Sequence, residues 1–162
     1  MSEPPTHSSV ENPQGTSAVC DVVVIIPARN EEHRLPTQLE ALDHQTDLDF
    51  RVVVSDNGST DGTRQVCEQW EPRFLSIDVV DSRHRPGVAG ARNTAIEATD
   101  EPLILICDAD DRVHPTWVAT MRRVLADAHG ATGPLYAKYP EEPEHDHVWF
   151  PAGVPVSMAY RP

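Results

Sequence analysis

Four short apolar runs recur along the chain, and each is followed by a polar or glycine-rich segment. The runs occupy residues 21–26 (DVVVII), 50–55 (FRVVVS), 75–80 (LSIDVV) and 102–107 (PLILIC). Their apolar positions are largely continuous rather than alternating, which is typical of strands buried on both faces of a parallel sheet. We therefore predict four buried strands.

Apolar residues between these runs follow helical spacing. Helices are expected over residues 36–45, 60–70, 89–98 and 114–129. Within them, Val66 and Trp70 lie four residues apart, and Pro115 suits the first turn of the last helix. Because strands and helices alternate, the predicted fold class is α/β, with a mostly parallel central sheet flanked by helices.

The length of 162 residues indicates one domain with a substantial core. Residues 1–18 are rich in Ser, Pro, Glu and Thr, so we expect a disordered leader before a domain over residues 19–162. After residue 130 the pattern weakens to short strand-like pieces at 135–139, 147–150 and 154–160. No apolar run approaches the roughly 20 residues of a transmembrane helix.

Charge and cysteine content narrow the possible environments and partners. The formal net charge of −13 argues against nucleic acid as a partner, and a phosphorylated ligand would need an arginine or a divalent cation beside it. Cys20, Cys67 and Cys107 are an odd number without paired spacing, which favours buried free thiols in a reducing compartment. We expect a cytoplasmic protein, with peripheral membrane association left open.

The segments that follow the four strands concentrate the chemically reactive side chains. They are PARNEE (27–32), DNGSTD (56–61), RPGVAGARN (85–93) and DADD (108–111). Ligands of open α/β sheets bind beyond the carboxyl ends of the strands, where these segments converge. We therefore expect the functional site at this edge.

The acidic segment after the fourth strand indicates a metal site. Asp108 and Asp110 can both point into a cleft and share an oxygen-preferring cation such as Mg²⁺ or Mn²⁺. An alternative is that Asp110 or Asp111 only caps the following helix. Three adjacent carboxylates repel one another without a nearby cation, which favours the metal.

The carboxylate of Asp56 accepts hydrogen bonds and donates none. It therefore suits the imide N–H of uracil or the N1–H and amine of guanine better than adenine. The alternative is an Asx-turn, for which DNGS is suitable, with Gly58 free to adopt positive φ. Asp61 is expected to complement the dipole of the next helix.

Three further side chains are candidates for ligand contacts. Arg29 could stack on a base or meet phosphate, and Glu31 could either contact the ligand or cap the next helix. Arg92 could reach the nucleotide or form a surface ion pair. The Gly87–Gly90 region lacks the spacing of a dinucleotide-binding loop and instead allows a helix to approach the sheet closely. His145 and His147 lie in a solvated acidic run, so zinc is not expected.

Taken together, the four segments resemble the family 2 glycosyltransferases with the GT-A fold, over roughly residues 20 to 125. The resemblance implies an inverting, metal-dependent transfer from a nucleoside-diphosphate-sugar, UDP- or GDP-linked, to a hydroxyl of an unknown acceptor. It implies a nucleotide-sugar-binding part at 19–130 and a partial acceptor side at 131–162, with the C-terminal part of the fold truncated.

The resemblance also implies roles for individual residues. Pro27, Arg29 and Glu31 would bind the donor, Asp56 would read the base, Arg92 would lie near the base or diphosphate, Asp108 would approach the ribose, and Asp110 would hold the metal.

The catalytic residues stay unassigned, because the chain ends where the family usually carries its general base. One alternative is a non-catalytic or fragmentary nucleotide-sugar-binding module. A nucleotidyltransferase is a second alternative, but PARNEE lacks the glycine that its phosphate loop would require.

Overall fold

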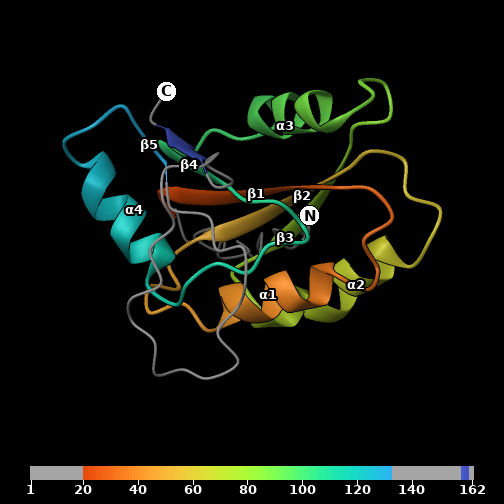
Figure 1. The fold of residues 1–162 in the computed structure, drawn as a ribbon, viewed down its shortest axis with the longest axis horizontal. Coiled ribbons are helices and arrows are strands. Elements are labelled where there is room, and N and C mark those ends of the chain that lie inside the picture. Colours follow the sequence, from red (N-terminus) through yellow and green to blue (C-terminus); the bar gives the residue numbers. More distant parts are fainter. Residues whose placement is uncertain (1–19, 133–157, 161–162) are drawn as a thin grey trace, which may run out of the picture.

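A computed structural model describes residues 20–132 and 158–160 (Figure 1). Its strands are β1 (Val22–Ala28), β2 (Arg51–Asp56), β3 (Ile77–Asp81), β4 (Leu103–Ile106), β5 (Gly130–Thr132) and β6 (Met158–Tyr160). Its helices are α1 (Leu35–Asp43), α2 (Thr63–Trp70), the short 3₁₀ helix η1 (Glu71–Arg73), α3 (Val88–Glu97) and α4 (Trp117–Leu125). All four predicted strands and all four predicted helices are present, but β3, at the edge of the sheet, has only Ile77 buried, so only β1, β2 and β4 are buried strands.

The strands form one sheet in the order β3-β2-β1-β4-β6-β5. β1 pairs in parallel with β2 and β4, and β2 pairs in parallel with β3. β6 is antiparallel to both β4 and β5. The predicted α/β class and parallel central sheet are therefore confirmed, and an antiparallel pair extends the sheet beyond β4.

The two faces of the sheet pack against different helices (Figure 1). Val22, Val24 and Ile26 of β1 face the larger core with α1, α2 and α4, whereas Val23 and Ile25 face the smaller core with α3. All five side chains are fully buried. The continuous apolar runs of the sequence follow from this arrangement, since every position of a central strand is covered on one face or the other.

The start of α3 requires glycine at two positions. Gly87 has φ of +92°, which L side chains rarely adopt, and a Cβ on Gly90 would lie 2.2 Å from the carbonyl oxygen of Arg85. On the sheet side, the carbonyl of Ala91 accepts a 2.8 Å hydrogen bond from the Ser55 hydroxyl. Small residues thus do allow close packing, but Gly90 accommodates the preceding loop rather than the sheet.

Cys20, Cys67 and Cys107 are free and buried, as expected. No helix in the described ranges is long and apolar enough to cross a membrane. β6 confirms a strand within the predicted piece 154–160. The predictions for the leader, for 135–139 and 147–150, and for His145 and His147 lie outside the described residues.

Candidate functional site

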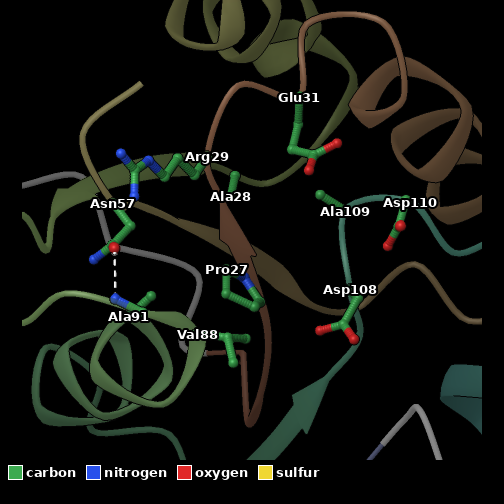
Figure 2. A pocket seen from close by; sticks show the side chains of 11 residues that line it. Pro27, Ala28, Arg29, Glu31, Asn57, Val88, Ala91, Asp108, Ala109 and Asp110 are labelled. Atoms are coloured by element: carbon green, nitrogen blue, oxygen red, sulfur yellow. Dashed lines mark hydrogen bonds between the residues drawn. The ribbon is translucent and has the colours of Figure 1, made fainter. Parts of the chain in front are cut away.

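A pocket of about 290 Å³ opens at the carboxyl ends of β1, β2 and β4 (Figure 2). It is lined by Pro27, Ala28, Arg29, Glu31, Asn57, Gly87, Val88, Ala91, Asp108, Ala109 and Asp110. In the view of Figure 2, Arg29 and Asn57 lie on one side of the pocket and Asp108 and Asp110 on the other. The pocket is where the topology of a parallel sheet predicts a ligand site.

Most of the side chains singled out from the sequence meet at this pocket. Pro27, Arg29, Glu31, Asp108 and Asp110 line it. Two others, Asp56 and Arg92, are not lining residues, although both lie next to residues that are. Their proposed roles in donor binding stay predictions.

The loop after β1 is fixed by hydrogen bonds to the loop after β2. The backbone N–H of Glu31 donates to Thr63 Oγ1 at 2.9 Å, and the N–H of Gly62 donates to Glu32 Oε2 at 2.6 Å. Asn30 adopts φ of +59°, accepts a bond from the N–H of Thr60 and donates its own N–H to a serine of the same loop. Arg29 and Glu31 are therefore presented to the pocket by a firmly held backbone.

Asp56 ends β2 with a side chain that is only 2% exposed. Its Oδ1 accepts the backbone N–H of Ser59 at 2.8 Å, and its Oδ2 accepts Arg64 Nε at 2.5 Å. Burial raises the pKa of this carboxyl, but the hydrogen bonds from Ser59 and Arg64 outweigh burial, so its pKa is below the ordinary value. Asp56 is thus a fixed anion whose two oxygens already have internal partners.

Asp61 lies just before α2, consistent with its expected place at the helix N-terminus. Its Oδ1 accepts both the N–H of Thr63, at 3.1 Å, and the Thr63 hydroxyl, at 2.5 Å. Its Oδ2 accepts the N–H of Glu32 at 3.1 Å. Asp61 therefore helps to join the loops after β1 and β2 as well as starting the helix.

Asn57 was expected only as part of a turn, yet it lines the pocket and shapes one wall of it. Its amide nitrogen donates to the carbonyls of Ser82 and Arg85 at 2.8 and 2.9 Å, and its Oδ1 accepts the N–H of Gly87 at 2.9 Å. These bonds anchor the loop that precedes α3. Its position directly after a buried strand was the sequence signal for this role.

Asp108 and Asp110 each contact an arginine from another element. Asp108 Oδ1 accepts Arg92 Nη2 at 2.6 Å, and Asp110 Oδ2 accepts Arg34 Nη1 at 3.3 Å. These arginines supply part of the positive charge that the acidic segment requires.

Asp111 responds differently to the same cluster. Burial, and then the negative charges of Asp108 and Asp110, raise the pKa of the Asp111 carboxyl, although a hydrogen bond from the N–H of Asp108 opposes the shift. Asp111 is therefore held against the backbone of the loop, while Asp108 and Asp110 line the pocket.

The donor set at Asp108 and Asp110 fits a hard divalent cation, because carboxylate oxygens are preferred ligands of Mg²⁺ and Mn²⁺. Within residues 20–132, no group of three His, Cys, Asp or Glu side chains is arranged to hold a metal by itself. Mg²⁺ commonly takes one or two protein carboxylates together with water and substrate phosphates. The site therefore fits a cation whose coordination a bound diphosphate would complete.

Arg29 is exposed at the rim of the pocket and has no hydrogen bond or ion pair to another residue of the described part of the chain. Arg92 keeps one unsatisfied group, since its buried Nε has no partner among the described residues. The pocket thus carries both carboxylates and, on Arg29, available guanidinium donors, a combination suited to a metal-bound phosphate ligand.

Comparison with known proteins identifies the relatives of the chain. It is 34% identical over 137 residues to validoxylamine A glucosyltransferase of Streptomyces hygroscopicus subsp. limoneus. The alignment covers 83% of this chain and 30% of that protein. It is 32% identical over 105 residues to glycosyltransferase AglE of Haloferax volcanii, which covers 64% of this chain and 34% of the relative. The chain thus spans about a third of the length of these relatives.

Among solved structures, it is similar to the mannosyltransferase PcManGT of Pyrobaculum calidifontis in complex with GDP-Man and Mn²⁺. The TM-score is 0.62 at 30% identity, covering 68% of this chain and 34% of the other. The sequence model of glycosyl transferase family 2 matches residues 23–156. The chain therefore belongs to glycosyl transferase family 2.

Proposed function

We propose that this chain carries the donor-binding part of a metal-dependent, inverting glycosyltransferase that uses a UDP- or GDP-linked sugar and an acceptor hydroxyl. The observation that supports this most is the convergence of Asp108, Asp110 and Arg29 on one pocket at the strand ends. Support also comes from the Pyrobaculum mannosyltransferase, whose structure is a complex with GDP-Man and Mn²⁺.

In this proposal, different residues of the pocket contact different parts of the nucleotide-sugar. Asp110, with Asp108 beside it, would hold the cation, and the cation would offset the negative charge that develops on the departing diphosphate. Arg29 would contact the nucleotide from the opposite rim, as a guanidinium with available donors. Val88 and Ala91 are apolar residues of the same lining.

Asp56 would favour uracil or guanine over adenine. Its carboxylate is ionised and buried, with Ser59 and Arg64 holding it as an acceptor. A carboxylate has about four lone-pair positions, so the two internal bonds leave acceptor capacity for a base N–H. The selectivity would arise because adenine lacks an N–H donor at the matching ring position.

The second candidate function is a nucleotide-sugar-binding module without catalysis. The small share of its relatives' length that the chain matches supports this candidate. The chain spans 30% and 34% of the two curated relatives, so residues for acceptor activation could lie in parts of them that it does not match. A carboxylate poised near neutral pH normally removes the proton of the acceptor hydroxyl. The two candidates share the donor site and differ only in turnover.

Calorimetric titration tests the shared claim. UDP-glucose and GDP-mannose are titrated into the chain with Mn²⁺ or with EDTA, using the native chain, Asp110→Ala and Asp78→Ala. Asp78 is a matched control, because its side chain is 54% exposed against 51% for Asp110 and it also pairs with an arginine.

At least one donor should bind with Mn²⁺, and Asp110→Ala should weaken that binding by more than about tenfold while Asp78→Ala leaves it unchanged. Equal donor affinity in Asp110→Ala and the native chain would refute the metal assignment. Release of UDP or GDP on incubation, with the sugar passing to water in place of the unknown acceptor, would favour the enzyme, and stable binding without release would favour the module.

A further inference from the structure

Arg34 connects two carboxylates that line the pocket from different loops. Its Nε and Nη2 contact Glu31, from the loop after β1, at 2.7 and 2.8 Å, and its Nη1 contacts Asp110, from the loop after β4, at 3.3 Å. Glu31 and Asp110 both line the pocket, whereas Arg34 is not a lining residue. One guanidinium therefore neutralises part of both acidic rims.

The side chain of Arg34 can move more readily than the other arginine in this acidic region. It is 58% exposed, whereas Arg92, which pairs with Asp108, is 26% exposed. The 3.3 Å hydrogen bond to Asp110 is long for a charge-assisted one, whereas the 2.8 Å hydrogen bond and the 2.7 Å ion-pair contact to Glu31 are within the usual range. The contact between Arg34 and Asp110 is thus the weakest link of the group.

We propose that Arg34 is a positioning residue that keeps the affinity of the pocket for a free divalent cation low by holding Asp110 in a competing ion pair. The inference rests on the proposed function, since it takes Asp110 as the residue that would bind the cation. A cation that takes Asp110 must replace the guanidinium or bind beside its positive charge, and both are unfavourable.

A bound diphosphate changes this balance. Its phosphate oxygens can accept hydrogen bonds from the guanidinium of Arg34 once that group has moved away from Asp110. The cation and the nucleotide therefore bind together more readily than either alone. Arg34 would thereby couple uptake of the metal to arrival of the donor.

Substitution of Arg34 tests this coupling. The affinity for Mn²⁺ is measured from the electron paramagnetic resonance signal of free Mn²⁺, without nucleotide and at saturating UDP or GDP. The variants are Arg34→Gln, Arg34→Lys, which keeps the charge, and Arg73→Gln. Arg73 is the matched control, because it is 55% exposed and pairs with Asp43 at the C-terminal end of α1, and neither residue lines the pocket.

Arg34→Gln should bind Mn²⁺ alone about threefold to tenfold more tightly than the native chain, because a nearby positive charge is lost. The gain in Mn²⁺ affinity caused by the nucleotide should shrink correspondingly, and Arg34→Lys and Arg73→Gln should resemble the native chain. A purely structural role for Arg34 predicts the opposite, namely weaker binding in Arg34→Gln.

Two results would overturn the inference in distinguishable ways. If the native chain binds Mn²⁺ with the nucleotide but Arg34→Gln binds Mn²⁺ equally or less tightly, the inference fails and the proposed function stands. If the native chain shows no Mn²⁺ binding at all with UDP or GDP, the metal-dependent part of the proposed function fails and the inference fails with it.

Discussion

Arginine and carboxylate side chains have different roles at the two edges of the sheet, which are formed by the amino ends and the carboxyl ends of the strands. At the amino ends of the strands, Arg122 contacts Asp21, Asp47 and the carbonyl of Asp49, so its donors are satisfied by the protein itself. At the carboxyl ends, Arg29 has no partner within the described part of the chain. Arginine–carboxylate pairs join elements at both edges, but at the carboxyl ends Arg29 stays available to a ligand.

The comparison explains how an acidic chain can prepare a phosphate site. Pairs at the amino edge, such as Arg51 with Glu101, tie the sheet to neighbouring loops. At the pocket, Arg34 and Arg92 contact acidic residues of the rim without saturating them. Substitutions at the first edge should therefore change stability, and substitutions at the second should change ligand binding.

The largest effect on stability is expected at Arg122. Arg122→Ala should lower the free energy of unfolding by about 2 kcal/mol, because it leaves Asp21 and Asp47 close together without their shared cation. Chemical denaturation measures the loss. Arg123→Ala is the neighbouring control, since this exposed arginine has no side-chain partner within residues 20–132, and donor affinity should be unchanged in both variants. Loss of donor affinity in Arg122→Ala would contradict the claim that the amino edge contributes to stability and not to ligand binding.

Sequence alone predicted most of the fold and the edge of the sheet at which the pocket lies. Continuous apolar runs sufficed for β1, β2 and β4 because both faces of the sheet are covered there, whereas β3 is only partly buried. Pro27, Arg29, Glu31, Asp108 and Asp110 were expected at one edge, and they lie there, because each is at or shortly after the carboxyl end of a strand. Helix ends were less well predicted: α4 ends at Leu125 rather than at residue 129.

The contacts between loops were beyond what local pattern could indicate. Arg34 and Asp110 are 76 residues apart, and the sequence around each of them does not indicate that the two side chains are in contact. The pairing of Asp56 with Arg64, eight residues later, depends on the direction in which α2 runs after the loop that follows β2. Asn57 was interpreted as a turn residue, and its bonds to Ser82 and Arg85 appear only when β3 is placed beside β2.

A smaller effect is expected for base selectivity. In the native chain, UDP and GDP should bind about tenfold more tightly than ADP, and Asp56→Asn should reduce this preference because an amide can both donate and accept. Shifts in melting temperature across the three nucleotides, each with Mn²⁺, report the preference. Equal shifts for all three in the native chain would remove Asp56 from base recognition.

The smallest effect is the acid dependence of the pair at the amino edge. Burial raises the pKa of Glu101, but the hydrogen bond from Arg51 outweighs it, so the pKa in the folded state is below the ordinary value. Stability from this pair is therefore complete above the unfolded pKa of about 4.3 and is lost as the pH falls through the folded pKa. Glu101→Gln should cost about 1 kcal/mol at pH 7 and progressively less below pH 4. A cost that is independent of pH would contradict the ionic role of Glu101.

The account depends most on a divalent cation held between Asp110 and the diphosphate of a bound nucleotide. A crystal structure of the chain with Mn²⁺ and UDP or GDP, with anomalous scattering measured for manganese, tests this directly. The account predicts an anomalous peak within coordination distance of an Asp110 carboxylate oxygen and of the diphosphate. A nucleotide bound in the pocket without such a peak, or with manganese held by other residues, would contradict it.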